Sequence, residues 1–445
     1  MRAGILCVAA MLAASPAIAA SPVADAVKAD YDSRLRALFL DFHQNPELSF
    51  KETRTAAIMA RELRAVGGIA VTEGVGGTGV VGVMKNGPGP VVLVRADMDG
   101  LPLEEKSGLP YASKARQAGP DNVVSPVMHA CGHDVHITSM IGTARRLAAM
   151  KDRWRGTVLF VVQPAEERVG GAKAMIADGL YTRFPKPQYA LAFHVNSEHP
   201  TGTLSAPEGI SSSSADSVDI LVHGVGAHGA APHTGKDPVY IASQIVVALH
   251  GIISRERPPL RPGVITVGAF HAGSKHNIIS DRAELQVTVR ANDEETRAQL
   301  IAAIRRVAEG IGRANGLPDD KLPEVRVPEG TPTTINDAAL ARRLNARFAR
   351  TFGPDAVRPF EQTNMGAEDF AYFIEPKHGV RGYYFDVGGT PRAKVDAAQA
   401  GGPALPSHHS PLFRIDPEPS VRLGAEAMTV AVLELLQPGA APAAD

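Results

Sequence analysis

The chain contains almost no cysteine and carries almost no net charge. Cysteine occurs only at Cys7 and Cys131 among 445 residues. Lysine and arginine total 46 against 47 aspartates and glutamates, which gives a formal net charge of -1. Nucleic acids and anionic membranes attract strongly basic surfaces, so this balance indicates neither partner. The sequence also has no fixed-period repeat, which argues against a repeat architecture.

Length and composition indicate a soluble globular protein with two domains. Hydrophobic residues make up 44% of the chain and charged residues 21%, which is typical of a folded protein and not of a disordered one. A chain of 445 residues is longer than one ordinary hydrophobic core supports. We therefore expect two cores.

The first 20 residues have the pattern of a signal peptide. Arg2 supplies the positive end, residues 5–12 form a short apolar run, and residues 17–20 offer a small-residue cleavage site. The run is too short to span a bilayer, so we expect no membrane span. Cleavage near Ala19 to Ser21 would give an exported chain, either periplasmic or secreted. At the other end, the Pro/Ala-rich residues 438–445 are expected to be a disordered tail.

Removal of the signal peptide leaves Cys131 as the only cysteine. It lies in residues 128–136 (MHACGHDVH), where three histidines, a thiol and an aspartate are separated by small residues. Imidazole and thiolate are ligands of zinc and related divalent metals. A lone exported thiol cannot form an intrachain disulfide, whereas a metal would hold it as thiolate. The stretch therefore predicts a metal site. The alternative is a polar loop whose histidines cap a helix.

Strand and helix patterns alternate through most of the chain. Buried β runs at 91–94, 157–162 and 189–193 are separated by helical stretches. This alternation of strands and helices predicts an α/β/α domain with a mainly parallel sheet, formed by residues 21–213 and 331–437. Residues 214–330 between them follow the order strand-helix-strand-strand-helix-strand. That order is typical of a ferredoxin-like α+β domain, inserted into the larger one.

Acidic and imidazole side chains follow three of the predicted strands at their carboxyl ends. They are Asp97, Asp99, Glu166, Glu167 and His194. Open α/β sheets bind ligands at that edge. We therefore expect these residues to gather at one site.

The carboxylate pairs have several possible roles. If Glu166 and Glu167 lie on extended backbone they point to opposite sides, so that one can bind a metal while the other acts as a base. Asp97 and Asp99 are two residues apart and share a face, so that one can reach the site while the other orients a ligand. The alternatives are two surface glutamates and a turn before Pro102.

Candidates elsewhere in the chain are less specific. His228 lies in a glycine-rich turn, which either approaches a ligand closely or is an exposed turn. Arg290 either binds a substrate carboxylate or is a strand-surface charge, and Asn277 lies beside the same strands. A late histidine would complete a split ligand set, and the doublet His408-His409 leaves the choice open.

Seven motifs, in order, resemble those of the aminoacylase, hippurate hydrolase and indoleacetyl-amino-acid hydrolase group of co-catalytic metallopeptidases. They cover nearly all of the mature chain and comprise RADMDGLP (95–102), MHACGHDVH (128–136), QPAEE (163–167), FH (193–194), GAHGAAPH (226–233), NIISD (277–281) and HSP (409–411). Arg168 stands where the group commonly has glycine, so we expect the pocket wall to differ.

The resemblance implies two divalent metal ions per subunit, with manganese, zinc, cobalt and nickel all compatible. The implied ligands are Cys131, His133, Glu167, His194 and His409. Glu166 would be the general base, and Asp99 would orient a metal ligand. His228 would reach across a homodimer to polarise the scissile carbonyl, while Asn277 and Arg290 would hold the substrate's carboxylate or backbone. The inserted domain would serve as lid and dimerisation domain.

The implied reaction is metal-dependent hydrolysis of the amide bond of N-acyl amino acids. A water molecule activated by the two ions would lose its proton to Glu166, which would return the proton to the leaving amine. Within the group, the alternative is an exopeptidase acting on dipeptides. A binding protein without catalysis is the alternative from a different class. Such proteins usually lack the base or a ligand, whereas the implied set is complete here.

Overall fold

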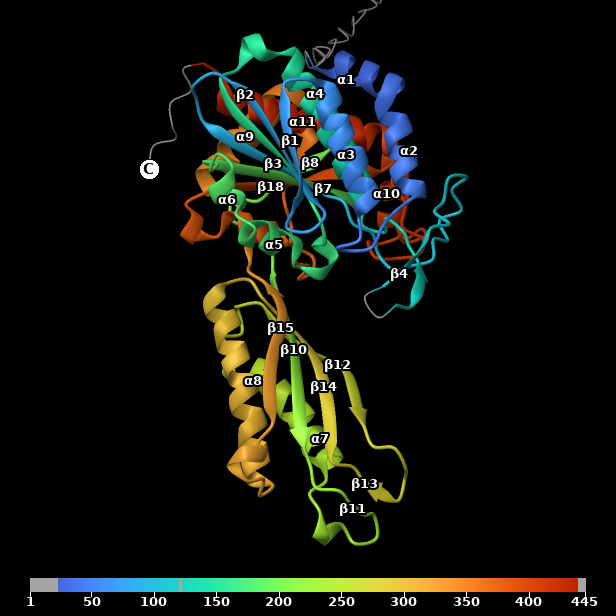
Figure 1. Ribbon diagram of the computed structural model, residues 1–445, viewed down its shortest axis with the longest axis vertical. Coiled ribbons are helices and arrows are strands. Elements are labelled where there is room, and N and C mark those ends of the chain that lie inside the picture. Colours follow the sequence, from blue (N-terminus) through green and yellow to red (C-terminus); the bar gives the residue numbers. More distant parts are fainter. Residues whose placement is uncertain (1–22, 120–121, 439–445) are drawn as a thin grey trace, which may run out of the picture.

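The computed structural model describes residues 23–119 and 122–438 and has two lobes (Figure 1). The large lobe contains an eight-stranded sheet, and the elongated small lobe extends from it on a four-stranded sheet. The predicted signal peptide and residues 439–445 of the predicted tail lie outside the described residues.

The large sheet has the strand order β1-β2-β6-β3-β7-β18-β8-β17. Strands β6, β3, β7 and β18 are parallel neighbours, while β1, β2 and β6 pair antiparallel. The strands are β1 (Ile69–Val75), β2 (Gly79–Asn86), β3 (Val91–Asp97), β6 (Gly156–Gln163), β7 (Tyr189–Pro200), β8 (Leu204–Ser205), β17 (Val357–Arg358) and β18 (Arg381–Thr390). The predicted mainly parallel sheet is confirmed.

Helices cover both faces of this sheet because its central strands are apolar on both sides. In β6, Val158 and Phe160 pack on one face, and Leu159 and Val161 on the other. The first face is covered by α2 (Arg36–Gln44), α3 (Thr53–Val66), α4 (His133–Ala149), α9 (Ala338–Phe352) and α11 (Pro417–Leu436). The second is covered by α5 (Gly171–Ala177), α6 (Leu180–Arg183) and the 3-10 helix η8 (Asp369–Ile374). The α/β/α layering is therefore as predicted.

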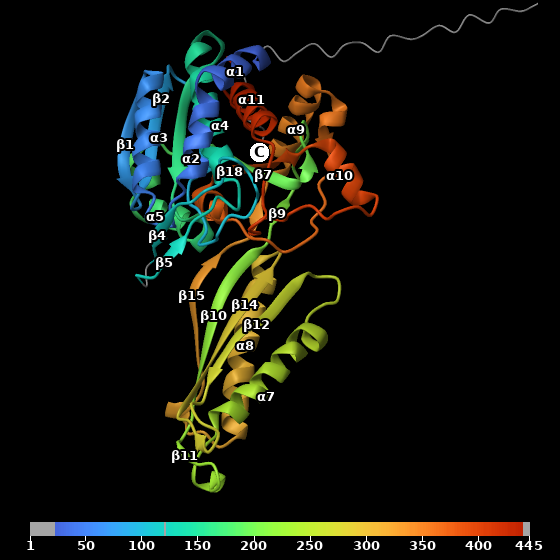
Figure 2. The same cartoon turned by 90° about the vertical axis from the view of Figure 1, so that its right-hand side faces the viewer.

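The small lobe is an antiparallel sheet of order β12-β14-β10-β15 with two helices on one face (Figure 2). Its elements are β10 (Ser214–His223), α7 (Pro238–Gly251), β12 (Gly263–Ala272), β14 (Arg282–Ala291), α8 (Glu294–Ala314) and β15 (Glu324–Thr331). Alternate residues of β14 are buried under the helices, which leaves Thr288 and Arg290 on the opposite face. At the far end of the lobe, β11 (Ala227–His228) pairs with β13 (Ile278–Ile279).

The chain enters the small lobe through β10 and leaves it through β15, which are neighbouring strands. Ala215 lies opposite Thr331 in their register, so the two connections run side by side. On the large-lobe side, β9 (Ile210–Ser212) pairs with β16 (Thr334–Ile335). Paired strands therefore join the lobes in place of loose linkers.

Candidate metal centre and substrate cleft

The predicted ligand residues gather at the carboxyl edge of the parallel strands. β3 ends at Asp97 and pairs in register with β6, which ends at Gln163. The Glu166-Glu167 turn follows β6, and His194 lies on β7, on the other side of β3. The sheet therefore brings three distant segments of the chain to one place, as the strand-end argument predicts.

The MHACGHDVH stretch forms a tight turn that leads into α4. The helix begins at His133, directly after Gly132, whose φ of 84° lies in the left-handed region. A Cβ at Gly132 would lie 2.3 Å from a neighbouring side-chain carbon, so the turn requires glycine. Cys131 Sγ lies 3.3 Å from His194 Nε2. Burial, and then the charge of Glu167, raise the pKa of the Cys131 thiol, so a thiolate here requires a cation.

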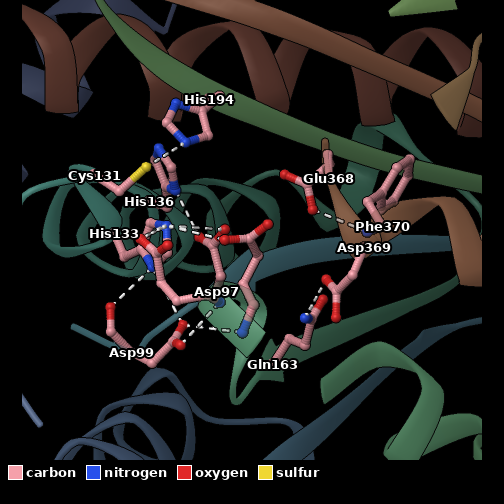
Figure 3. A network of polar contacts seen from close by, with 12 residues as sticks. Asp97, Asp99, Cys131, His133, His136, Gln163, His194, Glu368, Asp369 and Phe370 are labelled. Carbon is pink, nitrogen blue, oxygen red and sulfur yellow. Dashed lines mark hydrogen bonds and ion pairs between the residues drawn. The ribbon is translucent and has the colours of Figure 1, made fainter. Parts of the chain in front are cut away.

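His133 is held between two aspartates (Figure 3). Its Nδ1 donates to the backbone carbonyl of Asp99 at 2.9 Å, and its Nε2 lies 3.5 Å from Oδ2 of Asp97. Nε2 is buried and has no hydrogen-bond partner in the described part of the chain. Burial lowers the pKa of His133, but the surrounding carboxylates, Asp97 foremost, outweigh it and raise the pKa to about 10. So much negative charge around one imidazole favours a bound cation.

The expectation that Glu166 and Glu167 lie on extended backbone and point apart is wrong. They begin the 3-10 turn Glu166–Arg168, which follows Ala165 at a left-handed φ of 48°. Both carboxylates therefore turn the same way, and Oε2 of Glu166 and Oε1 of Glu167 each lie 3.9 Å from His133 Nε2. Oε1 of Glu167 is another buried atom without a hydrogen-bond partner in the described structure.

Asp99 supports the same turn. Its Oδ1 accepts the N–H of Glu166 and its Oδ2 the N–H of Glu167, each at 3.1 Å. Oδ2 also accepts the Ser49 hydroxyl at 2.6 Å. Because its carbonyl oxygen holds His133, Asp99 orients both an imidazole and the glutamate pair. A simple turn before Pro102 does not describe these contacts.

The structure distinguishes the two histidines of the late doublet. His409 Nε2 lies 3.3 Å from Oε2 of Glu167. Both ring nitrogens of His408 already have neighbours, because Nε2 accepts the Ser197 N–H at 3.3 Å and Nδ1 lies 3.7 Å from Cys131 Sγ. The contacts therefore favour His409 as the ligand, whereas His408 packs beside Cys131 and bonds the backbone.

The residues present fit two divalent ions. Five groups of potential ligand atoms each lie within 4.8 Å among the described residues; one is formed by Cys131, His133 and His194 and another by Cys131, Glu167 and His409. Cys131 belongs to both of these groups. The set combines sulfur, nitrogen and oxygen ligands, which suits zinc, manganese, cobalt or nickel. The buried Nε2 of His133 and Oε1 of Glu167, otherwise without partners among the described residues, point to the same conclusion.

A buried ion-pair network behind Glu166 has no counterpart in the sequence predictions. Arg95 contacts Asp97 and Glu368 at 2.7 Å and Asp369 at 3.2 Å. Burial, and then the Glu368 charge, raise the pKa of Glu166 well above its usual range. An arginine within the buried run of β3 was the available signal, since a buried guanidinium requires acidic partners.

A cleft of about 840 Å³ beside the metal centre is lined by both lobes. The large lobe contributes Arg168, which forms an ion pair of 2.7 Å with Glu329 of the small lobe. Arg290 also lines the cleft and donates to the Thr288 hydroxyl at 3.2 Å. In the described part of the chain no carboxylate forms an ion pair with Arg290. Its guanidinium therefore remains able to bind a carboxylate of a ligand.

His228 and Asn277 do not join this site within one chain. His228 lies on β11, and Figure 1 shows this strand at the far end of the small lobe, remote from the large sheet. There the Asn277 carbonyl accepts the N–H of Gly229 at 2.9 Å, and the exposed His228 ring accepts the N–H of Ala230 at 3.0 Å. The structure thus places two predicted site residues together, but away from the metal centre.

Comparisons with known proteins agree with this architecture. Residues 93–400 match the family described as peptidase family M20/M25/M40. Thermostable carboxypeptidase 2 of Saccharolobus solfataricus is 37% identical over 86% of this chain and 91% of its own. The hippurate hydrolase of Campylobacter jejuni is 39% identical over 75% of this chain and 83% of its own.

A solved structure from Bacillus subtilis, described as a dinuclear metal binding peptidase of the M20 family, has the same fold. It aligns with a TM-score of 0.72 at 29% identity and covers 92% of this chain and 99% of its own. The match includes both lobes and is made to a protein with two metals. The chain belongs to peptidase family M20/M25/M40.

Proposed function

We propose that the protein is a metal-dependent amidohydrolase that cleaves the amide bond of N-acyl amino acids. One observation carries the proposal. The buried carboxylate of Glu166 faces the same centre as the two candidate ligand groups that share Cys131, and it lies 3.9 Å from His133 Nε2. Similarity to a hippurate hydrolase supports the substrate class, since hippurate is an N-acylated glycine.

The proposed ligands are Cys131, His133, Glu167, His194 and His409. Two divalent ions held there would acidify water and stabilise negative charge on the substrate's carbonyl oxygen. The mixed donor set is compatible with zinc, manganese, cobalt or nickel, and availability often decides between them.

Glu166 is the proposed general base. Burial raises its pKa above the usual range of a carboxyl group, which suits a residue that first takes a proton and later returns it. It takes the proton of the attacking water and delivers it to the leaving nitrogen. Asp99 keeps the Glu166 N–H in place, while Arg290 across the cleft binds the carboxylate of the amino-acid part.

The proposed active form is a homodimer in which the partner's His228 completes the cleft. Helix α7 supports this, because residues 238–256 form the one described helical stretch long and apolar enough to cross a membrane, with only 33% of it buried. Its exposed apolar side chains are Val239 (39% exposed), Tyr240 (56%) and Val247 (74%). In a water-soluble protein such a face favours contact with a second copy. His228 would then polarise the scissile carbonyl from the other chain.

A carboxypeptidase is the second candidate, because the Saccharolobus relative bears that name at 37% identity. Arg290 would hold the terminal carboxylate of a peptide equally well. Metal-loaded protein should be assayed against N-acetyl-, N-benzoyl- and N-indoleacetyl-amino acids and against dipeptides. We expect the highest kcat/KM for an N-acyl amino acid. A preference for peptides would favour the second candidate, and no turnover of any of them would contradict both.

The proposed location is outside the cytoplasm, after cleavage near Ala19 to Ser21. The support is the sequence pattern of residues 1–20. N-terminal sequencing of protein from periplasmic and medium fractions should give a chain that begins near Ala20 or Ser21. Uncleaved protein confined to the cytoplasm would contradict export.

A further inference from the structure

The turn that carries Glu166 and Glu167 has an unusual backbone for residues with side chains. Ala165 before it and Val169 after it both have left-handed φ values, of 48° and 45°. Left-handed backbone is unfavourable for residues with a Cβ, because the Cβ crowds the neighbouring carbonyl oxygen. The surrounding structure must therefore hold this turn in place.

Glu52 is bonded to the start of that turn. Its carboxylate is fully buried, and Oε1 accepts the N–H of Ala165 at 2.8 Å. The same oxygen accepts the N–H of Phe50 at 2.9 Å, and Phe50 is also left-handed, with a φ of 61°. The other oxygen, Oε2, accepts the Thr78 hydroxyl at 2.5 Å. One carboxylate thus joins two strained backbone positions that lie far apart in sequence.

The Glu52 side chain does not do what a side chain at the start of a helix usually does. Glu52 is the N-cap of α3, yet its side chain makes no capping bond to its own helix. No lysine or arginine in the described structure forms an ion pair with it. Burial, and then the Asp99 charge, raise the pKa of Glu52 to about 7, so its position costs free energy that an exposed glutamate would avoid.

Glu52 and Asp99 act on successive peptide groups. Glu52 accepts the N–H of Ala165, and Asp99 accepts the N–H groups of Glu166 and Glu167. Three consecutive backbone donors are therefore fixed by two buried carboxylates. This arrangement determines the direction in which the two glutamate side chains leave the backbone.

We propose that Glu52 is a positioning residue of the metal centre: by holding Ala165 in the left-handed conformation, it directs the Glu166 and Glu167 carboxylates toward His133. The role is that of a hydrogen-bond acceptor, not of a charge. It rests on the proposed metal function of the turn, and the experiment below separates the two.

Zinc titration of chelator-treated full-length mature protein, read with a competing chromophoric chelator, measures the effect directly. Glu52→Ala removes the acceptor, and we expect the weaker of two zinc affinities to fall by about 10- to 100-fold, the usual range for losing a residue that orients a ligand. Glu52→Gln keeps an oxygen acceptor and should stay within about threefold of wild type. Glu62→Ala is the matched control, since Glu62 is buried on the same helix but pairs with Arg34 away from the site.

A second variant tests the left-handed conformation of Ala165 without relying on Glu52→Ala alone. Glycine adopts a left-handed φ without penalty, so Ala165→Gly should restore much of the zinc affinity lost in Glu52→Ala while changing wild type little. In thermal unfolding of the zinc-free protein, Ala165→Gly should raise the midpoint more in Glu52→Ala than in wild type. If Glu52→Ala does not fold, Ala165→Val, which disfavours the left-handed conformation, should itself weaken zinc binding with Glu52 intact.

Several results would overturn the proposal. Glu52→Ala with wild-type zinc affinity, Glu52→Gln as weak as Glu52→Ala, an equal loss in Glu62→Ala, or unaltered zinc binding in Ala165→Val would each do so. Additive effects of the Glu52 and Ala165 substitutions on the unfolding midpoint would also contradict it. Wild-type protein that binds fewer than two zinc ions would instead contradict the proposed function. The unfolding midpoints of wild type, the two single variants and the double variant would still test whether Glu52 stabilises the turn.

Discussion

Oε2 of Glu167 lies 3.3 Å from Nε2 of His409, a contact between the turn after β6 and the loop before α11. The inserted small lobe separates these two segments in sequence. Burial raises the pKa of Glu167 to about 8, and burial lowers that of His409, so neither group readily carries its charge unaided. A shared cation would favour both in their ligand forms, because carboxylate and neutral imidazole are what a metal binds.

Cys131→Ala should remove more metal than any other single substitution, because Cys131 belongs to both ligand groups. We expect fewer than two ions per chain after dialysis and a loss of activity of more than about 100-fold, beyond the range for residues that only orient a ligand. Metal analysis by mass spectrometry checks this. Cys131→Ser is the matched control for volume. Metal occupancy equal to that of wild type would count against the centre.

Glu166→Gln should leave metal content intact and abolish most turnover. The substitution keeps the shape of the side chain but removes its basicity, and we expect kcat to fall by about 100- to 10,000-fold, as for loss of a general base. Steady-state kinetics with parallel metal analysis tests the assignment. Substantial residual kcat at full metal content would mean that another group takes the proton.

His228 should act on the active site of the partner chain. Glu166→Gln and His228→Ala proteins should each have little activity alone. Subunit exchange between them should restore about a quarter of wild-type activity, because half of the C2 dimers become mixed and each mixed dimer has one site with both residues intact. No recovery after exchange verified by mass spectrometry would contradict the role in trans, as would a fully active monomer in ultracentrifugation.

His43 should make stability depend on pH above neutrality. Its Nδ1 lies 2.7 Å from Asp134 and its Nε2 3.2 Å from Glu105, so both nitrogens face buried carboxylates. Burial opposes the charged ring, but hydrogen bonds to Asp134 and Glu105 raise the pKa of His43 from 6.5 to about 9.

A raised pKa in the folded state stabilises the protein fully below the unfolded value and loses that effect as pH rises through the folded value. Wild-type unfolding free energy should therefore fall between about pH 6.5 and pH 9, by at most about 3 kcal/mol. His43→Gln should be less stable at pH 6 and should lack this part of the pH dependence. The same change of unfolding free energy with pH in both proteins across that range would contradict the ion-pair assignment.

The sequence alone determined the features that depend on local pattern. The apolar β runs at 91–94 and 157–162 give buried strands, because only a doubly covered sheet accommodates them. The carboxyl ends of parallel strands lie at one edge of the sheet, where ligands bind, so Glu166, Glu167 and His194 could be assigned to one site. Cys131 and His133 were identifiable because three histidines, a cysteine and an aspartate within nine residues are hard to explain by packing.

Only the tertiary structure decided the features that depend on distant partners. Glu166 and Glu167 converge because Glu52 and Asp99, from other segments, hold a turn that begins after a left-handed alanine, which local propensity opposes. His409 is distinguished from His408 by which of the two rings meets Glu167 across the inserted lobe.

The partners of Arg95 likewise come from a segment far along the chain, Glu368-Asp369. In each case the deciding energy is a hydrogen bond or ion pair in a buried environment. Its strength depends on exact spatial proximity, and periodicity and composition carry no information on that proximity.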